Sequence, residues 1–598
     1  MASETNQAAA ATLETYASLL DLSGGNPFRV RAFRRAAETI RDLKTSLIDI
    51  NAAGGLQALP GVGAGIAEAL DELLRQGRFS PLEELSREWP VALLELLAIE
   101  GLGPKTAAKL HRDYGVNDLE SLRAAAESGR LSEAGRGIET TVAMGLASLQ
   151  RRSGRHLLGA ALPLARQAAA DIRADRPGAE VSLAGSVRRM VETVADIDVL
   201  VVDEDIETAL ADITRLPIIT SVTERSSGRL RVLFRGGIAG DIVVVPPAEA
   251  GSALVRLTGN DAHLVLLGAL AAARTEAEVY CERGVPFVPP ELREGLDELQ
   301  PTGASRLASL VEAVDIRGEF HSHTTWSDGT ASVAEMARAA AERGYAFLGI
   351  SDHSHSLGVA RGLTGERLAA QRREISETQR ETSLRLFTSS EVEVSREGDL
   401  DFDDIVLEGL DVVIASLHVG LRRPRPELMQ RLRGVLENRH VDIVAHPSGR
   451  LIERRDGGDF DWNEAFRLAA RTGTALEINA DPTRLDLNGE LARQAIDAGC
   501  LLTINCDAHH PDGFTSMEYG VAMARRAGAA RASIVNCWTI AEIEAWLRDR
   551  RRPGAPGRGP VPASRPLGGK PRFLQLDPFL PQQLTNLARE NVVPLHTS

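Results

Sequence analysis

Apolar and polar positions follow several different patterns along the chain. Residues 1 to about 150 show the periodicity of amphipathic helices, in which Ala, Leu, Glu and Arg are interrupted by Gly and Pro. From about 155 to 245, one helical stretch is followed by runs rich in Val and Ile that predict strands, namely VSLAGSV, DIDVLVV, RLRVLF and GDIVVV. Residues 250 to 315 return to a mixed helical pattern.

A regular repeat of strand, loop and helix fills residues 316 to 550. The predicted strands are GEFHSH, FLGISDH, LFTSSEVEV, VVIASLHV, DIVAHP, ALEINA and LLTINCDAH. Strands that alternate with helices indicate βαβ units, and seven such strands favour a closed or distorted barrel. The Pro- and Gly-rich segment after Arg552 is typical of a flexible tail.

Composition narrows the class of protein. A chain of 598 residues with 43% apolar and 25% charged residues is globular, and about four domains are expected at ~150 residues each. No run approaches the ~20 apolar residues of a membrane helix, and the first residues lack the order of a signal peptide. We therefore expect a cytoplasmic protein with no membrane partner.

Charge and cysteine content add two constraints. Cys281, Cys500, Cys506 and Cys537 show no CxxC spacing, which favours free thiols over disulfides or a zinc ribbon. The net charge of −15 argues weakly against a generic polyanion binder. It does not exclude nucleic acid, because backbone amides and bound metal ions can also receive phosphate.

Histidines and carboxylates gather at the ends of the predicted barrel strands. Nine of the thirteen histidines lie between His321 and His510. The HxH and DxH pairs each place two side chains on one face of an extended segment, and strand ends of a βα-barrel converge on one face. The candidate metal ligands are His321, His323, Asp328, His353, Glu391, His418, His446, Asp507 and His509.

This ligand set exceeds the three or four groups of a single zinc site and suits two or three ions. Imidazole and carboxylate together favour zinc, manganese or iron. The alternative, a set of unrelated core or surface histidines, does not account for two such pairs at strand ends. Arg361 and Arg450 are further candidates that could clamp a phosphate.

The motifs HSHTTWSDG, SDHS, SSEVEV, ASLHVG, AHPSGR and NCDAH resemble those of the polymerase and histidinol phosphatase (PHP) domain. The resemblance implies a distorted (β/α)7 barrel with phosphoesterase activity and two or three Mn²⁺ or Zn²⁺ ions. By the family's pattern, one ion takes His321, His323, Glu391 and Asp507, a second takes Glu391, His418 and His446, and a third takes Asp328, His353 and His509.

A second group of carboxylates lies in the middle of the chain. Asp196 and Asp198 share one face of a predicted strand, and Asp241 on a later strand adds a third carboxylate. Three carboxylates suit two Mg²⁺ or Mn²⁺ ions whose other ligands are phosphate oxygens and water. Such a pair of ions can support transfer of a nucleotide to a 3′-hydroxyl.

The Gly-Ser turn before these aspartates resembles the palm of family X DNA polymerases, within the nucleotidyltransferase superfamily. The resemblance implies a nucleotide site made of Gly185, Ser186, Arg188, Arg189, Thr258 and Gly259. Several positions depart from the family's pattern, among them Val191, and Arg256 and Leu257 in place of two aromatic residues. Met190 replaces a glycine, Ala195 replaces another, and Leu264 stands where asparagine is typical. We therefore expect weaker nucleotide selection.

Two segments near the N-terminus, LPGVGAGIAEAL and IEGLGPKTAAKL, have the helix-hairpin-helix pattern. Its glycines allow backbone N–H groups to approach a DNA phosphate without sequence preference. The candidate DNA contacts are Gly61, Val62, Gly63, Gly101, Leu102, Gly103 and Lys105. Relatives of this family can carry a Schiff-base lysine after the first hairpin. Here Ala69 occupies that position, so we expect no lyase activity.

The resemblances together predict a multidomain fold. Its segments are a helical domain with the first hairpin (1–80), a fingers-like helical domain with the second (81–150), an α/β nucleotidyltransferase palm (151–245), a thumb with linker (246–315), the PHP barrel (316–550) and a tail (551–598). They imply a monomeric DNA polymerase that fills short gaps with dNTPs at gapped or nicked DNA, with 3′-5′ exonuclease or phosphoesterase activity in the barrel.

Three alternatives remain open at this point. A DNA 3′-end phosphoesterase could keep the polymerase core mainly as a binding platform, which the altered palm motifs favour. A scaffold without catalysis conflicts with two complete carboxylate and histidine sets. A phosphatase of small molecules is consistent with the barrel but does not explain the two helix-hairpin-helix segments.

Overall fold

The computed structural model describes residues 2–550, except 42, 44, 100, 101, 129, 132–136, 140, 143–145 and 147–153. The chain divides into two units. The first comprises Met1–Ser153 with Glu453–Arg455, and the second comprises Gly154–Ile452 with Asp456–Ser598. The predicted tail, 551–598, lies outside the described residues.

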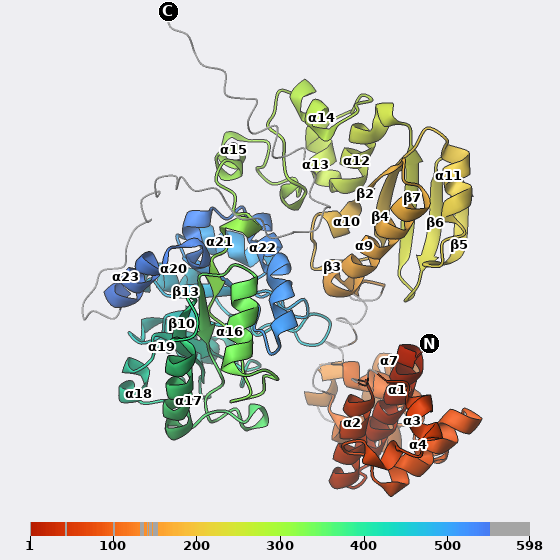
Figure 1. Cartoon of the computed structure of the whole chain (residues 1–598), viewed down its shortest axis with the longest axis vertical. Helices are drawn as coiled ribbons and strands as arrows, with labels where there is room; N and C mark the ends of the chain where they lie inside the picture. Colours follow the sequence, from red (N-terminus) through yellow and green to blue (C-terminus); the bar gives the residue numbers. More distant parts are fainter. Residues whose placement is uncertain are drawn as a thin grey trace, which may run out of the picture. The chain divides into compact units, whose positions relative to one another are not determined.

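The first unit is helical where it is described, as predicted (Figure 1). Its α-helices are α1 (Ala2–Leu22), α2 (Pro27–Arg41), α3 (Leu47–Ala52), α4 (Ala64–Gln76), α5 (Ser80–Ser86), α6 (Pro104–Tyr114) and α7 (Leu119–Glu127). The amphipathic helix α2 buries Phe33 against Tyr16 of α1, with ring centroids 4.7 Å apart. Aromatic edge-to-face packing of this kind adds to the apolar area that holds the helices together.

The second unit begins with a five-stranded sheet that follows the helix α9 (Leu158–Asp175). The strands are β2 (Glu180–Leu183), β4 (Ile197–Val202), β5 (Ile219–Ser226), β6 (Arg229–Phe234) and β7 (Ala239–Val245), in the order β2-β4-β7-β6-β5. Four of them match the predicted runs, and β5 does not. Residues 219–226 are mostly exposed and polar, so this edge strand has little of the apolar pattern that identifies a strand.

Short elements connect this sheet to the rest of the unit. The helix α10 (Gly185–Arg188) and the pair β1 (His156–Leu157) and β3 (Thr193–Val194) precede β4, and α11 (Ile206–Ile213) follows it. The region predicted as thumb contains α12 (Ala250–Thr258), α13 (Asp261–Leu267), α14 (Glu276–Glu282) and α15 (Pro301–Leu307). These helices share a core around Val255, Tyr280 and Val288.

A seven-stranded parallel sheet forms the C-terminal barrel, in the order β14-β13-β12-β11-β10-β9-β8. Its strands are β8 (Gly318–Glu319), β9 (Phe347–Ile350), β10 (Arg385–Glu393), β11 (Val412–Ser416), β12 (Ile443–Val444), β13 (Ala475–Asn479) and β14 (Leu502–Asn505). Six lie within a predicted run, and β10 begins one residue before its run. The barrel is nearly closed, because Ser322 and Ala508 form a parallel bridge and Asn536 Nδ2 donates to the carbonyls of Gly318 and Ile504.

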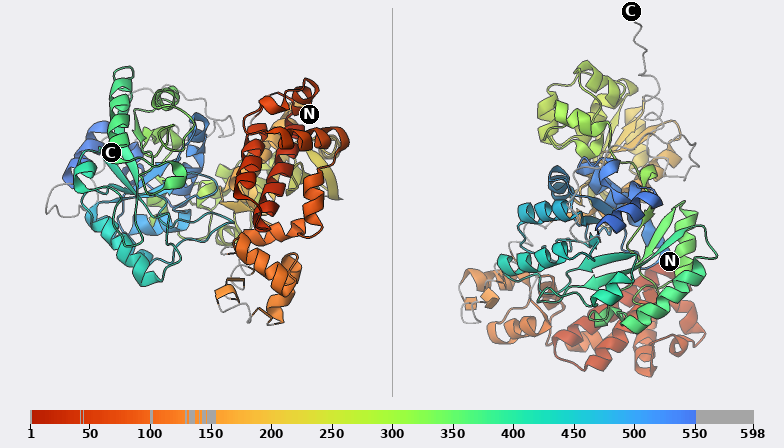
Figure 2. Two further views of the ribbon diagram at one scale, coloured as in Figure 1. Left: turned by 90° about the horizontal axis from the view of Figure 1, so that it is seen from below. Right: turned by 90° about the vertical axis from the view of Figure 1, so that its left-hand side faces the viewer.

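Helices surround these strands, as the green-to-blue ribbons of Figure 2 show. They are α16 (Val333–Glu342), α17 (Gly365–Thr378), α18 (Asp404–Glu408), α19 (Arg425–Glu437), α20 (Trp462–Thr472), α21 (Gly489–Asp497), α22 (Met517–Arg526) and α23 (Ile540–Arg550). Each long helix turns an apolar stripe inward, for example Phe466 and Ala469 of α20. Among the described residues, no helix combines the length and apolar character that a bilayer-spanning segment needs.

Candidate active sites

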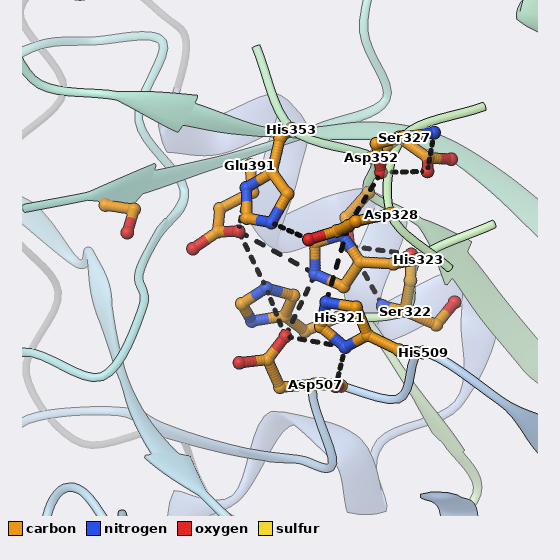
Figure 3. A network of polar contacts seen from close by, with 12 residues as sticks. His321, Ser322, His323, Ser327, Asp328, Asp352, His353, Glu391, Asp507 and His509 are labelled. Atoms are coloured by element: carbon orange, nitrogen blue, oxygen red, sulfur yellow. Dashed lines mark hydrogen bonds and ion pairs between the residues drawn. The ribbon is translucent and has the colours of Figure 1, made fainter. Parts of the chain in front are cut away.

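The nine predicted barrel ligands lie together around the C-terminal ends of the strands, and Figure 3 labels seven of them. His321 and His323 follow β8, His353 follows β9, and Glu391 lies in β10. The other ligands follow β11, β12 and β14 or come from the loop before α16; they are His418, His446, Asp507, His509 and Asp328. Parallel strands bring residues that are up to 188 positions apart into one cluster, which is how this fold assembles a site.

Within the cluster, the donor atoms form three groups. These are His323, Asp328, His353 and His509; His321, His323 and Asp507; and Glu391, His418 and His446. In each group the candidate ligand atoms lie within 4.8 Å of one another, which is close enough to share one ion. The His418 group has the members of the second expected set, whereas the His321 group lacks the Glu391 expected in the first set, and His323 also joins the residues of the third. Glu391 Oε2 is 3.5 Å from His321 Nε2 and Oε1 is 3.0 Å from His446 Nε2, so this carboxylate lies between two groups.

Several atoms of the cluster are buried and make no hydrogen bond of good geometry, although other candidate ligand atoms lie close, as His353 Nδ1 does at 2.7 Å from Glu391 Oε2. The buried atoms include His321 Nε2, both ring nitrogens of His323, Glu391 Oε2 and Asp507 Oδ1. A buried polar atom with no partner is costly, and such atoms that face one another usually share a ligand. The donor set of imidazole and carboxylate therefore fits divalent metal ions of the zinc and manganese type.

Charge in the cluster is balanced between its acids and imidazoles. Burial alone would raise the pKa of Glu391, but the imidazoles of His353 and His418 hold the pKa of this carboxyl well below its usual value. Burial lowers the pKa of His323 to about 4, aided by the nearby His353 and His509. A neutral imidazole is the form that binds a metal ion.

Two buried glutamates orient histidines of the cluster, and the sequence analysis did not single them out. Glu477 Oε1 accepts a hydrogen bond of 2.8 Å from His321 Nδ1, and Glu393 Oε2 accepts one of 2.6 Å from His418 Nδ1. Each bond leaves Nε2 to face the cluster. The available signal was an acidic residue in an otherwise apolar buried strand, which is unfavourable unless the acid is paired.

Asp352 fixes the loop that carries Asp328. Its carboxylate accepts hydrogen bonds from Thr324 Oγ1 at 2.7 Å and from the hydroxyl of Ser327. Figure 3 shows Ser327 and Asp352 beside the metal-ligand cluster. The side chain of Gln371 on α17 also donates to Asp352. Asp352 therefore connects the segment after β9, the loop that carries Asp328 and the helix α17 around the site.

Arg450, a candidate phosphate clamp, is already hydrogen-bonded to other groups of the protein. Its guanidinium donates to both carboxylate oxygens of Glu192 and to the carbonyls of Arg484 and Leu485. Arg361 has a left-handed backbone with φ of 56°, and its carbonyl accepts a hydrogen bond from Arg367. These contacts give Arg450 a structural partner in the palm and give no support to its predicted role as a clamp.

The palm carboxylates form the second candidate site. Asp198 of β4 and Asp241 of β7 are register partners on neighbouring parallel strands, and Asp196 precedes β4 by one residue. Burial raises the pKa of Asp198 to about 7, and the negative charges of Asp196 and Asp241 add to the effect. Burial together with this mutual repulsion favours a cation among the three acids.

Asp241 already has cationic partners. Arg229 of β6 donates to both of its carboxylate oxygens, at 3.1 and 2.6 Å, and Arg231 Nε lies 3.4 Å away. Burial would raise the pKa of Asp241, but these arginines lower it. Neither arginine is predicted from the sequence as a partner of the acids, although RLRVLF places both on one face of a strand.

The predicted nucleotide residues gather around α10. Gly185 has a φ of +61°, and a Cβ at this position would lie 1.9 Å from Asp198 Oδ2. Ser186 lies in the same turn of helix, next to the two arginines. This turn can therefore approach the carboxylates only because residue 185 is glycine.

Arg188 and Arg189 reach from α10 to the end of α12. Arg188 Nη1 donates to Thr258 Oγ1 at 2.8 Å, and Arg189 donates to the Thr258 carbonyl. Gly259 is the C-terminal cap residue of α12. The structure therefore brings the predicted residues Arg188, Arg189, Thr258 and Gly259 together.

Both arginines also face carboxylates. Arg188 pairs with Glu276 at 2.9 and 2.6 Å, and Arg189 Nε lies 3.4 Å from Glu294. Burial would raise the pKa of Glu276, but Arg188 and Arg293 lower it to about 2. Neither acid is predicted from the sequence as a partner of the nucleotide site.

The helix-hairpin-helix residues lie at the starts of two helices in the first unit. Gly63 is the N-cap of α4 and Gly103 is the N-cap of α6. Val62 and Leu102 are buried and anchor each turn, Gly61 has a φ of +80°, and Lys105 is exposed. Gly101 lies outside the described residues. Two exposed helix N-termini with glycine caps suit contact with phosphate.

Three family profiles match separate parts of this chain. The profile of the helix-hairpin-helix domain matches residues 4–79, that of the SAM-like helix-hairpin-helix tandem matches 93–140, and that of the PHP domain matches 319–481. The PHP match begins two residues before His321 and includes seven of the nine barrel ligands.

Individual relatives fall into two groups by length. The DNA polymerase/3′-5′ exonuclease PolX of Bacillus subtilis (strain 168) is 35% identical over 563 residues, which is 90% of this chain and 98% of that protein. A probable phosphatase of Thermoanaerobacter sp. (strain X514) is 24% identical over 246 residues, 39% of this chain and 95% of the relative. The first match spans both candidate sites.

Proposed function

The chain belongs to the PolX family of DNA polymerase/3′-5′ exonucleases, and we propose that it fills short gaps during DNA repair and trims 3′ ends in its barrel. It is an enzyme with a polymerase palm and a metal-dependent PHP domain. The observation that carries the proposal is the presence of two separate carboxylate centres in one chain, at the ends of β4 and β7 and at the ends of the barrel strands.

For polymerisation, we assign Asp196, Asp198 and Asp241 as ligands of Mg²⁺ or Mn²⁺. Ions at this position supply activation of the primer 3′-hydroxyl and neutralise charge on the leaving pyrophosphate. The chain's own contribution would be to hold the dNTP: Ser186 and Arg189 would bind its triphosphate, next to Thr258 and Gly259 at the end of α12. The register of β4 and β7 fixes the spacing of Asp198 and Asp241.

For 3′-end trimming, we assign the nine barrel residues as ligands of two or three Mn²⁺ or Zn²⁺ ions. Ions of this kind supply Lewis-acid activation at a phosphodiester. Glu477 and Glu393 hold His321 and His418 in the orientation that presents Nε2. We expect removal of 3′ nucleotides or of 3′ blocking groups, with cleavage at abasic sites as a further activity.

DNA and dNTPs are the substrates, and the two hairpins supply contacts to DNA that do not depend on sequence. We infer that the acidic chain acts as a cytoplasmic monomer on gapped or nicked DNA with a 3′ end. Light scattering after gel filtration tests the monomeric state, because it measures the molar mass. A monomer has a mass of 64.2 kDa, and a dimer would have twice that mass.

The test of this assignment uses a 5′-labelled primer that faces a one-nucleotide gap, with dNTPs and Mn²⁺. Asp196→Ala should abolish extension and leave shortening of the primer, whereas His321→Ala should abolish shortening and leave extension. Loss of both activities in either variant would contradict two independent sites.

A second candidate is a 3′-end phosphoesterase whose polymerase core mainly binds DNA. The contacts that favour it are the pairing of Asp241 with Arg229 and of Arg188 with Glu276, since both tie up groups that polymerisation needs. Shortening without any extension, unchanged by Asp196→Ala, would select this function.

A further inference from the structure

We propose that two arginines of the barrel, Arg526 and Arg450, position the turn that carries Arg189, so that the barrel is a structural part of the nucleotide site in the palm. The turn comprises residues 189–192 and joins α10 to β3. This inference rests on the proposed polymerase function and adds to it two positioning residues from the other catalytic domain.

The first contact comes from the last residue of α22. Arg526 Nη1 donates a hydrogen bond of 2.8 Å to the carbonyl of Arg189, 337 positions earlier in the chain. The same nitrogen lies 2.9 Å from Glu294 Oε1. The Arg526 side chain is only 16% exposed, so water competes weakly for these bonds.

Glu294 is shared between the two domains. Its Oε1 lies 2.9 Å from Arg526 and 3.4 Å from Arg189 Nε, while Oε2 accepts from Asn260 Nδ2 at 2.9 Å. Arg526 thus makes the shorter contact. Without Arg526, Arg189 would be the remaining arginine beside Glu294. A triphosphate would then have to compete with the Glu294 carboxylate for the Arg189 guanidinium.

The second contact holds the other end of the turn. Arg450, four residues after the barrel ligand His446, forms a bidentate pair with Glu192, with Nη1 to Oε1 at 3.1 Å. The carbonyl of Glu192 in turn accepts a hydrogen bond of 3.0 Å from Leu158 N at the start of α9. Arg450 is itself fixed by the carbonyls of Arg484 and Leu485.

Backbone conformation explains why the turn needs support. Met190 has a φ of 55°, in the left-handed region that a residue with a Cβ disfavours. In the family pattern, glycine occupies this position. A turn with this conformational cost persists when its surroundings hold it, and here the barrel contacts both the residue before Met190 and Glu192 after it.

Single-nucleotide insertion into a one-nucleotide gap tests the inference with the full-length protein. We expect Arg526→Ala to raise the KM for dNTP about tenfold, the effect of one lost charge-assisted hydrogen bond, with kcat changed less than threefold. Glu192→Gln should act in the same direction without altering the barrel. Arg526→Lys, which keeps the charge, should recover part of the loss, and Met190→Gly should reduce the effect of Arg526→Ala.

The matched control is Glu518→Gln. Glu518 of α22 pairs with Arg166 of α9 at 2.9 and 2.7 Å, so it links the same two domains without touching the turn. Its dNTP KM should equal that of the wild type. The 3′-5′ exonuclease activity of every variant, measured on the same primer, should stay within twofold of the wild type and reports that the barrel is folded.

Two results would overturn the inference. One is an unchanged KM in both Arg526→Ala and Glu192→Gln; the other is an equal rise in Glu518→Gln, which would show a general effect of domain contact. Failure of the proposed function is distinct from these, since the wild type itself would then insert no nucleotide.

Discussion

Glu477 Oε1 lies 2.8 Å from His321 Nδ1, and both side chains are fully buried. This pair fixes which ring nitrogen of His321 faces the metal-ligand cluster. Glu477 Oε2 also accepts a hydrogen bond of 2.7 Å from the backbone N–H of His446. One carboxylate therefore orients residues that belong to two different ligand groups.

We predict that Glu477→Gln lowers the metal affinity of the barrel about tenfold, because the amide is a weaker acceptor for a metal-bound histidine. Competition with a chelating dye measures this directly and needs no activity. Glu397→Gln, an exposed glutamate in the loop after β10, is the control and should leave the affinity unchanged. Equal affinities for all three proteins would remove Glu477 from the site.

Close approach of α10 to the palm carboxylates leads to a second prediction. Gly185→Ala would place a Cβ 1.9 Å from Asp198 Oδ2, so either the turn or the carboxylate must move. We expect primer extension to fall by about a hundredfold, since displacements of ~1 Å have this effect, while 3′-5′ exonuclease activity is retained. Gly178→Ala, at a glycine with open space around it, should extend primers normally.

The raised pKa of Asp198 makes the stability of the metal-free protein depend on pH. The pKa rises from 3.8 to about 7 on folding, so the stability that the protonated group contributes is complete below about pH 3.8 and is lost as the pH rises through 7. The loss is at most about 4 kcal/mol at about 1.4 kcal/mol per pKa unit. Asp198→Asn removes this penalty.

We therefore expect Asp198→Asn to raise the midpoint of thermal unfolding in EDTA at pH 8.5 and to have much less effect at pH 5. Differential scanning calorimetry at both values measures the change. Mg²⁺ should stabilise the wild type at pH 8.5 and stabilise the variant less. A difference between the two proteins that is the same at both pH values would contradict repulsion among the three acids.

Local signals in the sequence were enough to predict the barrel. The HxH and DxH pairs supply four of the nine candidate ligands, single residues near other strand ends and in the TTWSDG loop supply the rest, and the strand–helix repeat predicts the seven strands, because these features depend on residues close together in the chain. The helical first unit followed in the same way from its periodicity.

Partners that are distant in sequence could not be predicted. Glu294 and Arg526 are 232 positions apart, and Glu192 and Arg450 are 258 apart. In the sequence alone, each of these four residues looks like an ordinary charged surface residue. Its partner becomes apparent only in the fold, where the palm and the barrel meet. The sequence therefore predicts that Arg450 binds phosphate, because nothing near it in the chain indicates Glu192 as its partner.

The hairpin glycines provide the last prediction. Gly63 and Gly103 have φ values of −81° and −76°, and a Cβ on either would meet no atom within 4 Å. The fold itself therefore does not require glycine at these two N-caps. Glycine is expected where another molecule approaches the backbone closely, and here the approaching group would be a DNA phosphate at the helix N-terminus.

We predict that Gly63→Ala and Gly103→Ala each fold, with a stability loss of about 1 kcal/mol because alanine is a poorer N-cap than glycine, but bind gapped DNA about tenfold more weakly, since a Cβ would hold the phosphate away from the N–H groups. Fluorescence anisotropy with labelled DNA measures the affinity. Lys105→Ala should weaken binding through charge instead and reduce the salt slope by about 1, whereas the two glycine variants should leave that slope unchanged. Wild-type affinity in both glycine variants would mean that the hairpins do not contact phosphate through their backbone.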